Sequence, residues 1–171
     1  MASILSAALD KAVVPGFSRI GYAVRSRLQH WQPLTSFNLD GKNVVITGPT
    51  SGLGLETARQ LACLGANLVL VARNAEKSQR VIEELKPLCK GDTPVFIQAD
   101  VADLDQVRTA CSQISSQFSR IDVLIHNAGA LLNTREVSQQ GIEQTIACHV
   151  VGPFLMTSLL ISQLEGGRVI T

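Results

Sequence analysis

The stretch NVVITGPTSGLG, residues 43–54, joins a short apolar run to a loop that contains three glycines. Residues 44–47 are apolar or β-branched and predict a strand over residues 43–47, whereas residues 54–64 have the apolar spacing of a helix. A loop between a strand and a helix places free N–H groups and the positive end of the helix dipole together, and both attract phosphate. The stretch therefore favours a nucleotide-binding turn, and a plain βα turn without a ligand is the alternative.

The residues of this loop have separate expected roles. Gly48 permits the sharp turn, Gly52 lets the backbone approach a pyrophosphate, and Gly54 allows the helix to pack closely on the strand. Thr50 and Ser51 add hydroxyl donors. Together the backbone amides and the two hydroxyls form a candidate phosphate site.

Beyond the loop, short apolar runs alternate with helical patterns. Four further strands are predicted, over residues 67–71, 95–99, 121–125 and 168–171, with helices predicted over 74–88, 103–118 and 142–164. Nearly continuous apolar strands are typical of a parallel sheet that is buried on both faces. The sequence thus predicts an α/β fold, a doubly wound Rossmann-type parallel sheet of about five strands, over residues 39–171.

Polar or small residues follow three of these later strands at the sheet edge where ligands of open α/β folds bind. Arg73 and Asn74 end the second strand, with no acid to hold the ribose hydroxyls of NAD. A guanidinium can instead bind a 2′-phosphate, so NADP is favoured over NAD, with a solvated surface arginine as the alternative. Asp100 follows the third strand and the segment 127–129 the fourth. Asp100 could equally begin the next helix, and Asn127 could simply brace a turn.

Composition excludes several classes of function. Of 171 residues, 46% are hydrophobic and 17% charged, and the net charge of +1 without a basic run gives no reason to expect a nucleic-acid partner. No apolar stretch approaches the roughly 20 residues of a membrane-spanning helix. Four separated cysteines without a His at metal spacing predict reduced, structural thiols and no metal site.

Residues 1–38 differ from the rest of the chain. They contain four basic residues and a single acid, Asp10, and apolar residues recur there at helical spacing. Such an amphipathic extension is typical of an organelle transit peptide or of a membrane-surface contact through residues 1–31. A helix that packs onto a cytoplasmic domain is the other interpretation, and both are left open.

The motifs resemble those of the short-chain dehydrogenase/reductase family. TGPTSGLG is similar to its cofactor loop, NAGA to its Asn-Ala-Gly motif, and Asp100-Val101 to its adenine-contacting pair. The resemblance implies an NADP-dependent oxidoreductase that acts on a small alcohol or carbonyl substrate. It further implies these cofactor contacts: pyrophosphate at Gly48, Ser51, Gly52, Leu53 and Gly54; the 2′-phosphate at Arg73; adenine at Asp100 and Val101; ribose and the sheet centre at Asn127, Ala128 and Gly129.

One position departs from the family pattern. His149 stands where the family usually has an asparagine in the helix after the fourth strand. Pro153, four residues later, lacks the N–H that would bond the carbonyl of residue 149, so a bend is expected there. By resemblance that carbonyl holds a proton-relay water, which makes His149 the catalytic candidate. A polar residue that merely faces the crevice is the alternative.

The family's Tyr-x-x-x-Lys pair has no counterpart in the 171 residues. Tyr22 is the single tyrosine, and no lysine follows Lys90. We therefore expect a truncated copy of a longer enzyme, with strand 168–171 as an exposed sheet edge that lowers solubility or needs a partner. A non-catalytic short isoform that binds a nucleotide or a partner is the second hypothesis, and a methyltransferase-like fold the third. Homo-oligomers are left open.

Overall fold

The computed structural model describes residues 18–171, which divide into two compact units between Phe37 and Asn38. In the first unit, helix α3 (Arg19–Leu28) begins at Ser18, whose side chain accepts a hydrogen bond from the Gly21 N–H. A short 3-10 turn, η1 (Leu34–Ser36), follows. The predictions for residues 1–17 lie outside the described residues, so the membrane-surface and packing interpretations of the extension stay predictions.

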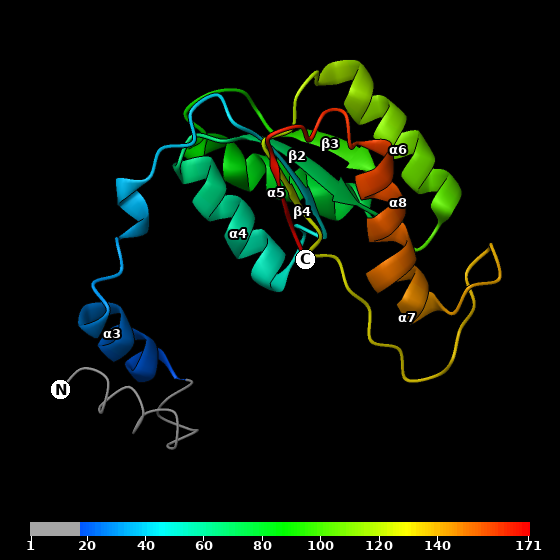
Figure 1. The fold of residues 1–171 in the computed structure, drawn as a ribbon, viewed down its shortest axis with the longest axis horizontal. Coiled ribbons are helices and arrows are strands. Elements are labelled where there is room, and N and C mark those ends of the chain that lie inside the picture. The colour runs from blue at the N-terminus through cyan, green and yellow to red at the C-terminus, as the bar shows by residue number, and fades with distance from the viewer. Residues whose placement is uncertain (1–17) are drawn as a thin grey trace. The chain divides into compact units, whose positions relative to one another are not determined.

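The second unit is built on a five-stranded parallel sheet with the strand order β3-β2-β1-β4-β5 (Figure 1). Its strands are β1 (Asn43–Thr47), β2 (Asn67–Ala72), β3 (Val95–Gln98), β4 (Val123–Ile125) and β5 (Arg168–Ile170). The chain moves outward from β1 to β3, returns to β4 on the other side of β1, and continues to β5. This order confirms the predicted doubly wound, Rossmann-type α/β fold.

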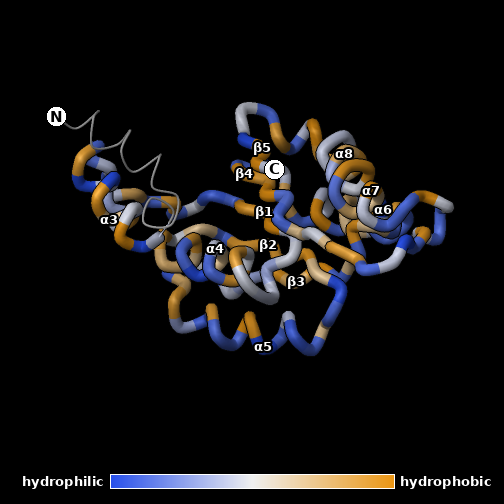
Figure 2. Tube along the Cα trace, turned by 90° about the horizontal axis from the view of Figure 1, so that it is seen from below, coloured by the Kyte–Doolittle hydropathy of each residue, from blue (hydrophilic) through white to orange (hydrophobic). Residues whose placement is uncertain are grey.

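Helices cover both faces of the sheet. Four of them make up the two layers: α4 (Gly52–Cys63) and α5 (Ala75–Leu85) on one side, and α6 (Leu104–Gln117) and α8 (Gly152–Leu159) on the other (Figure 1). Alternate residues of β1 face opposite layers, because Val44 and Ile46 pack with α4 and α5 whereas Val45 packs with α6 and α8. All three are fully buried, and Figure 2 shows the hydrophobic strands between the helices.

Side chains cap the helices that begin near the carboxyl ends of the strands. Asn74 accepts the Lys77 N–H at 2.8 Å and starts α5, as its sequence position predicts. Asp103 accepts the N–H groups of Asp105 and Gln106 and starts α6. The Gln106 side chain does not bond the Asp103 N–H, as it would in a capping box: it donates to the Asp103 carboxylate and accepts the Asp100 N–H.

The predicted long helix over residues 142–164 is wrong in its extent and regularity. A short helix α7 (Gln144–Ile146) continues into a π-helical segment η3 (Ala147–Val151) and then into α8. The Gly152 N–H bonds the carbonyl of Ala147, five residues back, directly before Pro153. The proline lacks a donor and its ring crowds the preceding turn, which explains a widened helix at the place where a bend was expected. Turns replace the helix after Leu159.

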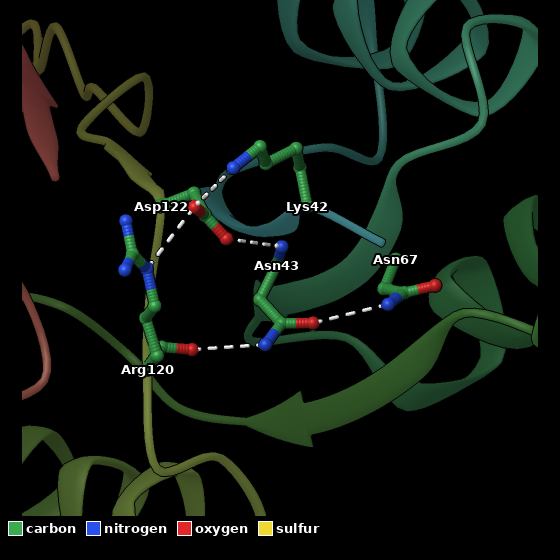
Figure 3. A network of polar contacts seen from close by, with 5 residues as sticks. All are labelled: Lys42, Asn43, Asn67, Arg120 and Asp122. Atoms are coloured by element: carbon green, nitrogen blue, oxygen red, sulfur yellow. Dashed lines mark hydrogen bonds and ion pairs between the residues drawn. The ribbon is translucent and has the colours of Figure 1, made fainter. Parts of the chain in front are cut away.

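A polar network holds the amino ends of three strands together (Figure 3). Asp122 accepts hydrogen bonds from Lys42 Nζ at 3.0 Å, from Arg120 Nε at 3.2 Å and from the Asn43 N–H at 3.0 Å. The Asn43 side chain in turn accepts from Asn67 Nδ2 and donates to the Arg120 carbonyl. These contacts tie β1, β2 and β4 at the edge opposite to their carboxyl ends.

Candidate functional site

A cavity of about 480 Å³ opens where β1, β2, β3 and β4 end. Segments that are far apart in the sequence line it, because parallel strands bring their carboxyl ends to one edge. The sequence-predicted residues that line it are Gly48, Thr50, Ser51, Leu53, Gly54, Arg73, Asn74, Asp100, Val101, Asn127, Ala128 and Gly129. Gly52 and His149 do not line this cavity.

The turn after β1 is packed too closely for side chains at two of its glycines. Gly48 has φ of +68°, and a Cβ there would lie 2.8 Å from the Ala128 Cα. A Cβ on Gly54 would lie 2.3 Å from both the Gly48 carbonyl oxygen and Asn127 Nδ2. The turn therefore rests directly against the end of β4. Gly54 is needed for this contact with the turn and β4, rather than only for the predicted contact of helix and strand.

The N-terminus of α4 supplies donors at the cavity. Ser51 is its N-cap, but the Ser51 hydroxyl makes no capping hydrogen bond. The first-turn N–H groups of a helix have no intrahelical acceptor. Amides and hydroxyls that are not engaged by the chain can donate to an anion, and the helix dipole adds to the attraction.

Arg73 and Asp100 form an ion pair at the ends of β2 and β3. Arg73 Nη1 lies 3.3 Å from Asp100 Oδ2, and the Asp100 Oδ1 accepts the Ala102 N–H at 2.9 Å. Asp100 does not begin the next helix, because Asp103 is the N-cap of α6. The arginine side chain is 68% exposed, so the pair is one that solvent weakens.

Asn127 braces the turn after β1. Its side-chain amide donates to the carbonyls of Thr47 and Gly48, both at 3.1 Å. The hydroxyl of Thr47 accepts the N–H groups of Asn127 and Ala128 at 3.1 and 3.0 Å. Thr47 is buried and was missed as a site residue, although its place directly before the first glycine of the loop was a usable signal.

The His149 side chain contacts the loop after β4 instead of the cavity. Its Nε2 lies 3.1 Å from both the N–H and the carbonyl oxygen of Ala130. The imidazole Cε1 lies so near Gly129 that a Cβ there would be 2.8 Å away. This side chain therefore holds the segment 128–130 in place, and a catalytic role for His149 stays a prediction.

Three polar residues that the sequence reasoning missed also line the cavity: Lys77, Gln144 and Cys148. Lys77 lies in the first turn of α5, one helical turn beyond Arg73 and Asn74. Burial, together with the charge of Asp100, raises the pKa of the Cys148 thiol, so the thiol stays protonated near neutral pH. Of the three, only Lys77 could have been predicted from the sequence, because it follows Arg73 by one helical turn.

Within residues 18–171, no group of three or more His, Cys, Asp or Glu residues is placed to hold a metal ion. None of the described helices is long and apolar enough to cross a bilayer. The donors at the cavity are backbone amides, hydroxyls and cations, which suit a phosphate-bearing ligand.

Comparisons with known proteins identify the family. Residues 42–171 match the short chain dehydrogenase family. A short-chain dehydrogenase/reductase of Phomopsis amygdali is 37% identical over 131 residues, which are 74% of this chain and 39% of that protein. Retinol dehydrogenase 11 of Homo sapiens is 30% identical over 142 residues, which are 83% of this chain and 45% of that protein.

Solved structures show the same fold. A blue fluorescent protein from a metagenomic library, in complex with NADPH, has 35% identity and a TM-score of 0.65, over 77% of this chain and 55% of that one. The chain spans less than half the length of the curated relatives named above. The family match covers most of the chain and includes every strand of the sheet. The chain therefore belongs to the short chain dehydrogenase family.

Proposed function

We propose that this chain is the coenzyme-binding portion of an NADP(H)-dependent oxidoreductase that acts on an alcohol or carbonyl substrate. The cavity at the carboxyl ends of β1 to β4 carries the proposal, because it joins the glycine turn at one strand end to Arg73 at the next. The NADPH complex of the 35% identical solved structure supports the choice of coenzyme. The name of retinol dehydrogenase 11 supports an alcohol substrate.

In this proposal each strand end has one task. The turn from Gly48 to Gly54, with the free amides of α4, holds the pyrophosphate. Asp100 and Val101 flank the adenine, and Arg73 binds the 2′-phosphate. Asn127 acts through the backbone, since its amide fixes the carbonyls of Thr47 and Gly48. The coenzyme, when bound, supplies the hydride donor or acceptor.

We propose further that residues 1–171 bind the coenzyme without completing a reaction. Proton transfer to or from the substrate oxygen needs a positioned acid–base group. The family pattern uses Tyr-x-x-x-Lys, and this sequence holds only Tyr22, ahead of the glycine turn, and no lysine beyond Lys90. The same observation favours the second candidate function, a non-catalytic module that binds the nucleotide alone.

Titration of the chain with NADPH and NADH, followed by nicotinamide fluorescence, tests the coenzyme proposal. We expect saturable binding of both, with NADPH the tighter ligand. A folded sample that binds neither coenzyme contradicts the proposed function, and tighter binding of NADH contradicts the preference for the 2′-phosphate. An aldehyde added to the NADPH complex, or an alcohol added together with the oxidised coenzyme, is expected to cause no hydride transfer. Turnover by these 171 residues contradicts that expectation.

A further inference from the structure

Two cations line the cavity beyond β2, and their surroundings differ. Arg73 pairs with Asp100 at 3.3 Å, so a carboxylate already offsets much of its charge. Lys77 lines the same part of the cavity, and no carboxylate of residues 18–171 forms an ion pair with it. The neighbouring Glu76 pairs instead with Arg80, one turn further along the same helix. Two positive groups and one negative group at this end leave one net positive charge, and it resides on Lys77.

The position of Lys77 within α5 is unfavourable for the helix itself. Asn74 is the N-cap, so Lys77 is the third residue of the helix, and its N–H is already taken by the Asn74 side chain. A cation in the first turn opposes the helix dipole, and Glu or Gln is the residue type preferred there. A residue that breaks a local rule without a structural partner is expected at a functional site.

We infer that Lys77 is the residue that selects a coenzyme carrying a 2′-phosphate. This inference rests on the proposed function. It adds which residue supplies the net positive charge that attracts the 2′-phosphate. Arg73 supplies planar N–H donors to the 2′-phosphate. Its charge, however, mainly offsets the repulsion between the Asp100 carboxylate and that phosphate. Lys77, which is exposed and lines the cavity, supplies the excess attraction, and salt screens this attraction. NADH has no group that requires this charge.

The test compares the affinities of the full chain and its Lys77→Gln variant for NADPH and NADH at low ionic strength. We expect the substitution to weaken NADPH binding roughly tenfold, the effect of one charge near a partly exposed phosphate. NADH binding is expected to change less than about twofold, since NADH lacks the 2′-phosphate. The variant is also expected to lose part of the salt dependence of NADPH binding, because that dependence reports charge contacts.

A thermal denaturation scan of the free protein separates this role from a structural one. Removal of a cation from the first turn of α5 is expected to leave the melting temperature unchanged or slightly raised, whereas a structural lysine would lower it. Lys86→Gln is the matched control: it removes the same charge just after α5, outside the cavity. The control is expected to keep the wild-type affinities for both coenzymes.

The outcomes distinguish the inference from the proposed function. If the wild-type chain prefers NADPH and Lys77→Gln keeps that preference, the role of Lys77 is overturned and the proposed function stands. An equal loss of NADH binding in the variant also overturns it, because the effect would then not concern the 2′-phosphate. A wild-type chain that is folded and binds neither coenzyme overturns both.

Discussion

Asp122 shows how a single residue stabilises the edge of the sheet that lies away from the cavity. Its side chain is 11% exposed and accepts from a lysine, an arginine and a backbone amide at once (Figure 3). Burial acts to raise the pKa of Asp122, but the Asn43 amide and the charges of Lys42 and Arg120 outweigh it, so the pKa is lowered. The ionised form is therefore the one that stabilises the fold.

The first prediction concerns Asp122→Asn. We expect it to lower the free energy of unfolding by about 1–3 kcal/mol at neutral pH, because the amide cannot pair with the two cations. A lowered folded-state pKa gives stability above the unfolded pKa, near 4, that is lost as pH falls through the folded value. Urea denaturation at neutral and at successively more acidic pH is the measurement. A variant with the same acid-side loss as the wild type contradicts the assignment.

The second prediction concerns Gly54, where the added methyl group meets atoms that cannot move freely. A Cβ there would lie 2.3 Å from the Gly48 carbonyl oxygen, which belongs to the backbone of the turn. We expect Gly54→Ala to cost about 1–3 kcal/mol of stability and to weaken NADPH binding, since the turn must shift. Gly91→Ala is the control, because its Cβ would meet only Asn67 Oδ1 at 3.6 Å. Equal stability of the two variants would falsify the close contact.

Gly152 fixes where the helix after β4 lies. A Cβ on Gly152 would lie 1.9 Å from the Val101 carbonyl oxygen and 3.1 Å from the Ala147 carbonyl oxygen. The π-helical segment therefore ends where the chain touches the turn that follows β3. Val101 also lines the cavity, so this contact joins the packing of α8 to the candidate adenine site.

The third prediction is that Gly152→Ala displaces α8 from this turn. We expect a loss of about 2–3 kcal/mol in the free energy of unfolding, together with weaker binding of NADPH and NADH alike. Ser158→Ala, on the exposed side of α8, is the control and is expected to change stability by less than about 0.5 kcal/mol. Thermal denaturation and coenzyme titration of both variants provide the check, and an unchanged Gly152→Ala variant contradicts the tight contact.

The strands could be predicted from the sequence because their environment is uniform. β1 and β2 are apolar almost throughout and are buried on both faces, so pattern and structure agree. β4 is shorter than predicted: the Ile121 N–H bonds the Gln163 carbonyl, and the Asp122 N–H bonds the Asn43 carbonyl. The interrupted helix could be predicted only as a bend, since proline removes a donor but does not determine which carbonyl is bonded instead.

The part of the candidate site that lies at strand ends could be predicted from the sequence. Residues next to a strand end, such as Arg73 and Asp100, line the cavity as expected of this fold. Lys77 and Cys148 reach the cavity from inside helices, and helix rotation cannot be read from a sequence with this accuracy. His149 was placed correctly in the helix after β4, but its side-chain contact with Ala130 depends on the path of the intervening loop.

The sheet exposes apolar surface at one edge. β5 is the last strand in the order, and all three of its residues are exposed, with Ile170 at 45%. Further apolar side chains are exposed on and near α8, namely Val150, Phe154 and Ile161. An apolar strand edge with unpaired backbone groups is a template for association with another chain.

We therefore expect the 171-residue chain to self-associate in a concentration-dependent manner, and Ile170→Lys to weaken this association. We expect the dissociation constant from analytical ultracentrifugation to rise roughly fivefold, the equivalent of roughly 1 kcal/mol of lost apolar contact. A charge on an edge strand also disfavours new strand pairing. Leu131→Lys is the matched control, because Leu131 is 94% exposed in the loop after β4 and belongs to no strand. If both variants associate like the wild type, the contact between copies lies elsewhere, and the exposed helix residues Val150 and Phe154 become the next positions to change.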